Sequence, residues 1–430
     1  MESQDFGDQL RRHRMSVRMT QQQLADFSTL SVRAIRDLER GRAQRPRYDT
    51  VRLLAEVLRL DGRQRENFES VSRGLPELST VRGVDVTRFV PPVAPAEIVG
   101  RDAEARVLTD LLTVHGQRLV AVVGVAGVGK TRLLLDVAGI VQRDADWSVL
   151  WVPAADLDGL PAADLAATIG DRDTLLVVDG HGDARIPAAL VDVLHQCRGT
   201  RVVITAVDPG SVTGAQVFPL PPLEVPTRGD EDDLVALAQV GSVRLLITQL
   251  RRFRPTFRLR GENAAAVAGL CRALDGIPRA LEFAAAWCLV HTPEQLLEEI
   301  RRDPLTLRAP LTATADSPDL WASMRRTLDT VDPALREHLN RLAELDGAWS
   351  IPEAAGLIGC RTAELAWAVQ ALLIQGVIRC RAGRFAVLNL VQALYTERKS
   401  ARAGGRTPGV TRPGRPRRAP ALGVPVRPPA

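Results

Sequence analysis

The chain has 430 residues, of which 45% are hydrophobic and 25% charged, with a formal net charge of +5. A chain of this length predicts about three domains, each able to bury a core of its own. No apolar segment follows Met1, and the longest apolar stretch, near Leu119, is too short to cross a bilayer. These features exclude a membrane span and predict a soluble, cytoplasmic protein.

Positive charge is concentrated at the two ends of the chain. Residues 1–75 hold 15 basic and 11 acidic residues, and residues 401–430 hold seven arginines, seven prolines and no acid. Such an Arg/Pro-rich tail cannot build a core, so we expect it to be disordered. The five cysteines show no C-x-x-C pair, which favours free thiols in a reducing compartment over metal ligands or disulfides.

Residues 5–72 predict five short helices. A capping box begins the second helix at Thr20, Ser31 caps the third, Gly41 fits the end of the third, and the fifth starts at Asp61. Two short helices joined by a tight turn, the second rich in arginine, are typical of a helix-turn-helix. The apolar positions of the first two helices are Phe6, Leu10, Met15, Leu24 and Phe27.

This stretch resembles a known family of DNA-binding domains. The residues MTQQQLADFSTLSVRAIRDLERGRAQRPRYDTVRLLAEVL are similar to the phage-repressor (XRE) family. The resemblance implies that Ile35 and Leu38 pack inward and that Arg14 and Glu39 form an ion pair. It implies DNA contacts by Gln21, Ser31, Val32, Arg33, Arg36, Asp37, Arg40, Arg42 and Arg47.

Within this set the two kinds of contact have different consequences. Gln21, Arg40, Arg42 and Arg47 would contact phosphates and supply salt-dependent affinity. Arg33 can contact guanine in bidentate fashion, and Val32 can meet a thymine methyl group. The alternative is a small helical docking module whose arginines form only a solvated face.

The centre of the chain is the stretch RLVAVVGVAGVGKTRLLLDVAGIV, residues 118–141. An apolar run predicts a buried strand, a glycine-rich turn follows, and Lys130-Thr131 opens a helix. This is the G-x-x-x-x-G-K-T pattern, whose backbone N–H groups hold phosphates at a helix N-terminus. Lys130 and Lys399 are the only lysines among 56 basic residues. The alternative is an ordinary glycine-rich turn between a strand and a helix.

A second acidic element follows downstream. The apolar run 175–178 predicts a strand that ends in Asp179, where a carboxylate can reach Mg²⁺ through its water shell. Another apolar strand, 202–205, follows, and strands that alternate with helices predict a parallel sheet with its ligand at the carboxyl ends of the strands.

Two further segments resemble the NB-ARC and related STAND nucleotide switches. EIVGRDAEARVLTDLL resembles their V-G-R-E element, and LDGIPRALEFAAAW resembles their G-x-P element, although Arg279 stands where an apolar residue is usual. The resemblance implies that ATP or ADP binds with Mg²⁺. The glycine-loop motif predicts nucleotide contacts at Gly124, Gly127, Val128, Gly129, Lys130, Thr131 and Arg132, and Mg²⁺ ligands at Thr131 and Asp179. The resemblance adds nucleotide contacts at Val99, Gly100, Arg101 and Pro278.

The sequence departs from these switches at two places that matter for catalysis. The residue after Asp179 is Gly180 instead of an acid or an amide, and Val207 stands where an arginine usually reads the γ-phosphate. Because positioning and charge neutralisation are nearly all of phosphoryl-transfer catalysis, we expect at most a slow regulatory ATPase.

The fold class expected is multidomain: an all-α helix-turn-helix domain, then an α/β P-loop NTPase with a parallel sheet, then α-helical and winged-helix domains. The last of these is expected to contain a β-hairpin that turns at Ala382-Gly383. The expected divisions are 1–75 helix-turn-helix, 76–96 linker, 97–222 nucleotide-binding, 223–305 helical, 318–400 winged-helix-like and 401–430 tail, with a rigid connector at 218–226.

The function expected is a bacterial transcriptional regulator that binds double-stranded DNA, self-associates on it and is controlled by an adenine nucleotide. One alternative is a STAND-type signalling or defence NTPase whose N-terminal helices recruit a protein. Another is a degenerate switch that binds nucleotide only for stability.

Overall fold

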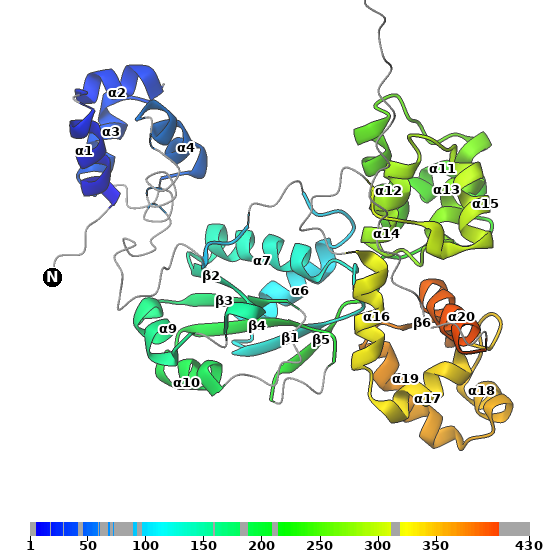
Figure 1. Ribbon diagram of the computed structural model, residues 1–430. Coiled ribbons are helices and arrows are strands. Elements are labelled where there is room, and N and C mark those ends of the chain that lie inside the picture. The colour runs from blue at the N-terminus through cyan, green and yellow to red at the C-terminus, as the bar shows by residue number, and fades with distance from the viewer. Residues whose placement is uncertain are drawn as a thin grey trace, which may run out of the picture.

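The computed structural model describes residues 6–17, 19–28, 30–41, 46–58, 60, 68, 72, 89–92, 97–157, 160–180, 188–208, 214–310 and 319–403. The helix expected from Asp61, most of the linker and the tail beyond residue 403 lie outside the described residues. Figure 1 shows the N-terminal helices on one side of a central sheet and the C-terminal helical units on the other. The expectation of a multidomain chain is therefore confirmed.

The N-terminal domain has its own core. Its described helices are α1 (Phe6–Ser16), α2 (Gln21–Ser28), α3 (Val32–Glu39) and α4 (Tyr48–Val57). Ile35 and Leu38 are buried in that core, as expected. Placing Phe27 and Met15 on the apolar side was wrong, because they are 66% and 59% exposed. The buried face of α2 contains Leu24, Ala25 and Ser28. Phe27 lies about 100° around the helix from the centre of that face.

A five-stranded parallel sheet forms the core of the central domain. Its order is β2-β3-β4-β1-β5. The strands are β1 (Leu119–Val123), β2 (Ser148–Pro153), β3 (Thr174–Asp179), β4 (Thr200–Ala206) and β5 (Gln216–Pro219). The expected connector at 218–226 is wrong in its first two residues, because Phe218 and Pro219 belong to β5. This strand lies at the edge of the sheet, where a proline is tolerated.

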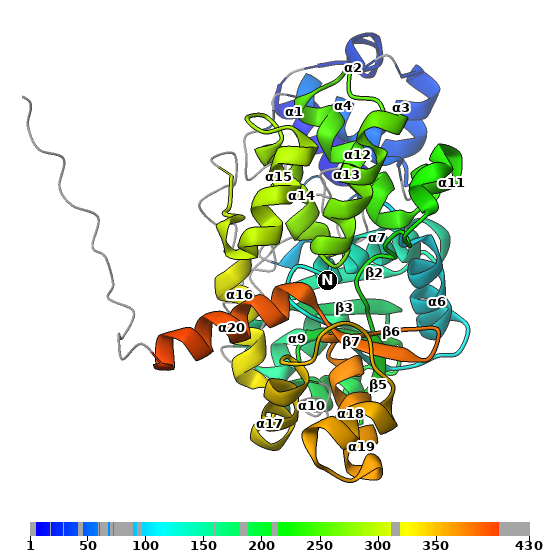
Figure 2. The same cartoon turned by 90° about the vertical axis from the view of Figure 1, so that its right-hand side faces the viewer.

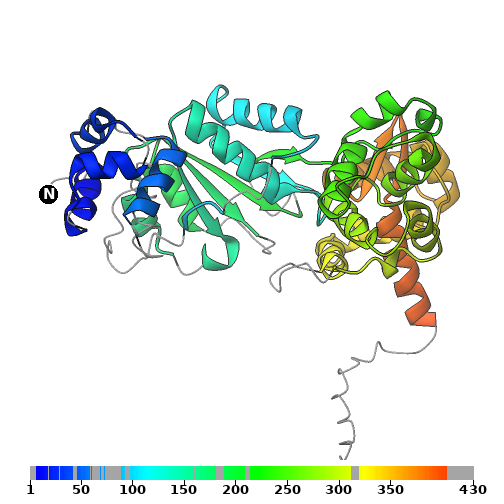
Figure 3. The ribbon, with the colours of Figure 1, turned by 90° about the horizontal axis from the view of Figure 1, so that it is seen from above.

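Helices cover both faces of the sheet (Figures 1 and 3). On one face lie α6 (Asp102–Thr113) and α7 (Lys130–Asp144), and on the other lie α9 (Ala162–Ile169) and α10 (Ala188–Gln196); the short helix α8 (Ala154–Leu157) follows β2. Alternate residues of each strand enter the two cores, which is why β1 reads as a continuous apolar run. The strand and the helix predicted around the glycine-rich turn are thus confirmed.

The helical domain follows the sheet. It contains the 3-10 turn η3 (Asp230–Asp232), α11 (Leu234–Gln239), α12 (Gly241–Phe253), α13 (Gly261–Ala273), α14 (Pro278–Trp287), α15 (Pro293–Arg302) and η4 (Pro304–Thr306). The segment from Leu234 to Leu250 has an apolar pattern that is continuous with one helix. The chain instead leaves the helical conformation at Val240, which is extended, and restarts at Gly241.

The last unit has the layout of a winged helix. Its elements are α16 (Leu320–Thr330), α17 (Pro333–Leu342), α18 (Ile351–Ile358), α19 (Thr362–Ile374), β6 (Ile378–Arg381), β7 (Arg384–Val387) and α20 (Asn389–Ala403). The hairpin turns at Ala382 and Gly383, both with positive φ, as expected. Figure 2 faces the helical units, with α11–α15 above and α17–α19 below. The last helix runs three residues into the segment expected to be a tail.

No single helix among the described residues is long and apolar enough to cross a membrane, although the bent pair α18 and α19 passes the same test when its members are combined. All five cysteines are free, as expected. Cys197, Cys271 and Cys288 are buried, whereas Cys380 is exposed.

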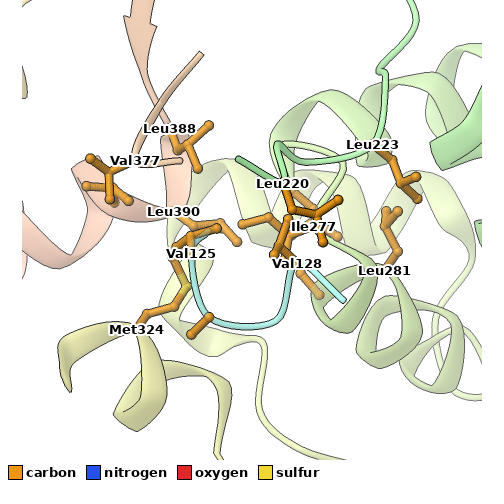
Figure 4. Packing of buried hydrophobic residues seen from close by; sticks show 14 of the residues in the cluster. Val125, Val128, Leu220, Leu223, Ile277, Leu281, Met324, Val377, Leu388 and Leu390 are labelled. Atoms are coloured by element: carbon orange, nitrogen blue, oxygen red, sulfur yellow. The ribbon is translucent and has the colours of Figure 1, made fainter. Parts of the chain in front are cut away.

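One hydrophobic core joins the sheet to both C-terminal units. It contains Val125 and Val128 of the glycine-rich turn, Ile277 at the start of α14, Met324 of α16 and Leu390 of α20. Figure 4 shows these side chains gathered around the turn. The turn after β1 is therefore the place where three units of the chain meet.

Candidate nucleotide site and candidate DNA-binding surface

The turn between β1 and α7 has the curled backbone that a phosphate loop needs. Gly127 and Gly129 have φ values of +80° and +101°, which only glycine adopts without strain. A side chain at Gly124 would come within 2.5 Å of the Leu220 carbonyl oxygen. The glycines of the motif are thus needed for the shape of the loop and for its close approach to the strand beside it.

Lys130 places a buried positive charge inside this loop. Its Nζ donates to the carbonyl oxygens of Gly124, at 2.5 Å, and Val125, at 3.3 Å. No carboxylate among the described residues forms an ion pair with it. Burial lowers the pKa of Lys130 to about 8, while the charge of Asp179 acts in the opposite direction. At neutral pH the site therefore holds an ammonium group whose direct partners are neutral, which fits an anionic phosphate chain.

Thr131 and Asp179 come together at the mouth of the loop. The Thr131 hydroxyl donates to Asp179 Oδ1 at 3.0 Å, although 48 residues separate them in the chain. Hydroxyl and carboxylate oxygens are ligands that Mg²⁺ accepts. The two residues expected to hold Mg²⁺, one from α7 and one from the end of β3, are thus adjacent, which fits that metal.

Thr205 is a functional candidate that the sequence reasoning missed. Its hydroxyl donates to Asp179 Oδ1 at 2.9 Å and accepts the backbone N–H of Gly180 at 2.9 Å. It therefore orients the carboxylate from the neighbouring strand β4. The signal in the sequence that could have identified Thr205 is a residue with a hydroxyl group near the carboxyl end of the strand that follows β3.

The two departures at the catalytic positions remain in three dimensions. Gly180 has no side chain to activate water, and Val207 is a largely buried apolar residue. The residues that follow Gly180, from His181 to Asp183, lie outside the described residues. The described part of the site thus contains binding groups, with no added base or arginine at these two places.

The outer side of the phosphate loop is covered by the helical and winged-helix units. A methyl group at Gly127 would lie 2.9 Å from Leu320 Cδ1 and 3.0 Å from Arg279 Cβ. On the other side, a methyl group at Gly376 would lie 3.2 Å from the backbone nitrogen of Val125. The loop conformation and the position of both units are therefore mechanically linked.

Residues of the V-G-R-E element lie beside the phosphate loop. The buried guanidinium of Arg101 donates to the carbonyl oxygens of Val128 (3.3 Å) and Pro221 (2.6 Å) and pairs with Glu104 (2.6 Å). Burial lowers the pKa of Arg101, which Glu104 counteracts. Val99 is half-buried in the same core, and Gly100 has a φ of +71° with its Cα against Gly241. Arg101 thus supports the loop, and its guanidinium N–H groups already have acceptors in Val128, Pro221 and Glu104.

The G-x-P element touches the loop from the helical domain. The backbone N–H of Arg279 donates to the Gly127 carbonyl oxygen at 3.2 Å, and Pro278 Cγ lies 3.9 Å from where a side chain at Gly129 would begin. Arg132 lies in the first turn of α7, where it is half-buried. The predicted nucleotide contacts therefore gather around one loop.

The basic residues of the hairpin are turned toward the protein. Arg379 pairs with Asp275 at 2.9 Å, Arg381 donates to the Val225 carbonyl oxygen, and Arg384 donates to the Ala348 carbonyl oxygen. These guanidinium groups join the winged-helix unit to its neighbours and to itself.

In the N-terminal domain the third helix carries an exposed polar face. The Ser31 hydroxyl accepts the backbone N–H of Ala34 at 3.1 Å and so caps α3. Arg33 is 92% exposed in its side chain and pairs loosely with Asp37 at 3.9 Å. Ser31, Arg36, Arg40 and Arg47 are exposed, Val32 and Asp37 are partly exposed, and Arg42 lies outside the described residues.

A buried network fixes the angle between the first and third helices. Arg14 Nε donates to Glu39 Oε1 at 2.6 Å, which confirms the expected ion pair. Gln21, expected at a phosphate, donates its amide N–H to Glu39 at 2.6 Å in this structure. The capping box at Thr20 is also present, with Gln23 as its second member.

Comparison with known families identifies the N-terminal domain. Residues 5–68 match a family described as a helix-turn-helix domain. The matched residues make up the first of the folded units.

Curated relatives cover more of the chain. The uncharacterized protein Rv0894 of Mycobacterium tuberculosis is 29% identical over 285 residues, which are 59% of this chain and 68% of that protein. A Mycobacterium tuberculosis protein named as an HTH-type transcriptional regulator, Rv0890c, is 32% identical over 201 residues. This second match spans 42% of this chain and only 21% of the relative.

Two solved structures are similar to the chain at low identity. A Walker-type ATPase of Pyrococcus abyssi has 12% identity and a TM-score of 0.42, over 72% of this chain and 98% of that one. A STAND protein of Pyrococcus horikoshii with a tetratricopeptide repeat sensor has 13% identity and a TM-score of 0.28, over 72% of this chain and 43% of that one.

Proposed function

We propose that this protein is a sequence-specific transcriptional regulator whose helix-turn-helix domain is controlled by ATP or ADP at the phosphate loop. The observation that carries the proposal is the presence, in one chain, of an exposed arginine-bearing helix α3 and a curled glycine loop around the buried ammonium of Lys130. Such a protein would work in the cytoplasm, at the nucleoid.

Each group in the nucleotide site has a separate role in this proposal. The loop amides and Lys130 bind the phosphate chain, while Val99, Gly100, Arg101 and Pro278 lie on the side proposed for the adenine. Mg²⁺, when bound, neutralises phosphate charge, and Thr131 and Asp179 would hold it. Because Gly180 and Val207 supply neither a base nor a cation, hydrolysis would be slow at most.

Nucleotide would control the chain through the units packed on the loop. Since Gly127 and Val125 contact α16 and the segment after α19, a change in the loop must move those units or strain them. ADP would favour this packed arrangement, and ATP a more open one. Opening would expose a surface for self-association, which pairs two helix-turn-helix domains on a symmetric operator.

The test begins with an operator selected from a pool of random duplexes with the purified full chain. Its affinity is then measured with ADP, with ATP and with no nucleotide, for the wild type and for Lys130→Ala. We expect the wild-type affinity to differ between ADP and ATP, and the variant to respond to neither. Equal affinity in all of these conditions would overturn nucleotide control.

A second candidate function is recruitment of a protein by the N-terminal helices in a signalling or defence NTPase. The exposed apolar side chains of Phe27 and Met15 are the groups that such docking would bury. A salt titration separates the two functions. DNA binding through several phosphates should fall by orders of magnitude between about 50 and 200 mM salt, whereas apolar docking should change little.

The third possibility, a nucleotide bound only for stability, has its own signature. ADP would raise the melting temperature, turnover would equal the blank, and operator affinity would not depend on the nucleotide. Melting curves recorded beside the operator measurements therefore separate a structural ligand from a switch.

A further inference from the structure

Arg279 is anchored at the phosphate loop. Its backbone N–H donates to the Gly127 carbonyl oxygen at 3.2 Å, and its Cβ would lie 3.0 Å from a methyl group at Gly127. The residue therefore begins its side chain directly beside the loop. Its guanidinium lies further along α14, over Phe283 and beside Glu282.

The guanidinium of Arg279 is held by weak contacts. Its Cζ lies 5.0 Å from the ring centre of Phe283, and its Nη1 lies 3.6 Å from Glu282 Oε2. Both members of the ion pair are about one-third exposed, so the pair contributes little to stability. Arg279 can exchange this carboxylate for another anion at small cost.

A second guanidinium that acts on the same carboxylate belongs to α7, directly after the loop. Arg132 follows Thr131 in α7, and its Nη1 is buried without a hydrogen-bond partner among the described residues. A buried donor with no acceptor is unfavourable, so this group favours an added anion. The positive charges of Arg279, Arg252 and Arg132 all act on Glu282.

Glu282 is a poor counter-ion for this cluster. Burial raises the pKa of Glu282, and the nearby arginines counteract that effect only in part. Three guanidinium groups thus act on one carboxylate, whose side chain keeps 40% of its surface exposed. The cluster has a surplus of positive charge, and two of its members, Arg132 and Arg279, belong to residues at the loop.

We propose that Arg279, together with Arg132, binds the phosphate chain of the nucleotide and releases Glu282 when the nucleotide enters. This inference rests on the proposed nucleotide site. A guanidinium presents several N–H groups in a planar fork that matches phosphate oxygens. The nucleotide would thereby hold α14 of the helical domain directly, and Glu282 would compete with it.

Calorimetric titration of the full chain with ADP and with ATP, both with Mg²⁺, tests this exchange. Arg279→Leu keeps an apolar stem and removes the charge, and it should weaken binding about 10-fold to 100-fold. Glu282→Gln removes the competing charge and should strengthen binding several-fold. If the ion pair were only structural, Arg279→Leu and Glu282→Gln would change the nucleotide affinity in the same direction.

Arg301→Leu is the matched control. Arg301 pairs with Glu298 at the same 3.6 Å and also three residues apart, in the reverse order, on α15 of the helical domain. Its nucleotide affinity should equal the wild-type value. Arg279→Lys, which keeps the charge without the fork, serves as a second variant and should show a smaller loss than Arg279→Leu.

The outcomes separate this inference from the function on which it rests. If the wild type binds neither nucleotide, the proposed function is wrong. If the wild type binds and Lys130→Ala does not, while Arg279→Leu and Glu282→Gln both match the wild type, only the exchange is wrong. Weaker binding by Glu282→Gln would also overturn it.

Discussion

Asp275 and Arg379 form an ion pair that joins the helical domain to the winged-helix unit, with Oδ1 and Nη1 2.9 Å apart. The other oxygen, Asp275 Oδ2, accepts the backbone N–H of Leu390 at 2.9 Å, at the start of α20. Asp275 directly precedes the G-x-P element, whose Arg279 contacts Gly127. Five consecutive residues thus link the winged-helix unit to the phosphate loop.

The pH dependence of stability should report on Asp275. Burial raises the pKa of Asp275 to about 6 from 3.8, although Arg379 and the N–H groups of Asn389 and Leu390 oppose the shift. Between these values the folded chain holds a proton that the unfolded chain has lost, so the free energy of unfolding falls as pH rises. Wild type should lose about 1 kcal/mol between about pH 5 and pH 7 through this group.

Urea unfolding of wild type and Asp275→Asn at both pH values measures that contribution. The variant should lack this part of the pH dependence. If the difference in unfolding free energy between the two proteins is the same at both pH values, Asp275 does not titrate in this range.

Gly127→Ala should destabilise the chain by packing as well as by backbone strain. Its φ is +80°, and the added methyl group would meet Leu320 and Arg279 at about 3 Å. Gly359→Ala is the control, since φ is +69° there and a methyl group would meet nothing. We expect Gly127→Ala to lower the free energy of unfolding by about 1–3 kcal/mol more than the control. If both variants lose the same free energy of unfolding, the helical units move away from the added methyl group at no cost in free energy.

Thr205→Val should weaken Mg²⁺-dependent nucleotide binding. The substitution keeps the shape and removes the hydroxyl that orients Asp179, and loss of such a supporting group lowers metal affinity about 10-fold to 100-fold. Nucleotide affinity measured with EDTA should not change. Thr174→Val, a buried threonine at the opposite end of β3, should bind like the wild type. A matching loss in EDTA would assign Thr205 to the fold instead.

Arg33 and Arg47 should differ in what they contribute to DNA binding. Arg33→Ala should relax the choice of base at one operator position by about 1–3 kcal/mol, because Arg33 begins the recognition helix. Arg47→Ala should weaken binding equally for all sequences and lower the slope against log salt by about one. Binding by selected and random duplexes across a salt series checks both, with exposed Arg52→Ala as control. Identical profiles for Arg33→Ala and Arg47→Ala would contradict this assignment.

Local sequence signals predicted the elements whose determinants are neighbours in the chain. The strand, glycine turn and helix around Lys130, the capping box at Thr20 and the turn at Ala382 follow from residues a few positions apart. Their backbone conformations are set by side-chain caps, positive φ angles and apolar periodicity, which a sequence displays directly.

Two further contacts join residues that are distant in the chain, one expected from family resemblance and the other from the glycine-loop motif and the order of the strands. The ion pair between Arg14 and Glu39 and the pairing of Thr131 with Asp179 join residues 25 and 48 positions apart. Neither distance appears in any local pattern of the chain.

The tertiary structure alone decided the remaining features. It placed Thr205 against Asp179, Asp275 against Arg379, and Arg279 against the phosphate loop. It also exposed Phe27 and made Phe218 part of an edge strand. Each outcome depends on which surfaces of distant elements meet. Apolar periodicity predicts that a helix has an apolar face. Which polar atoms become neighbours depends on the element against which that face packs.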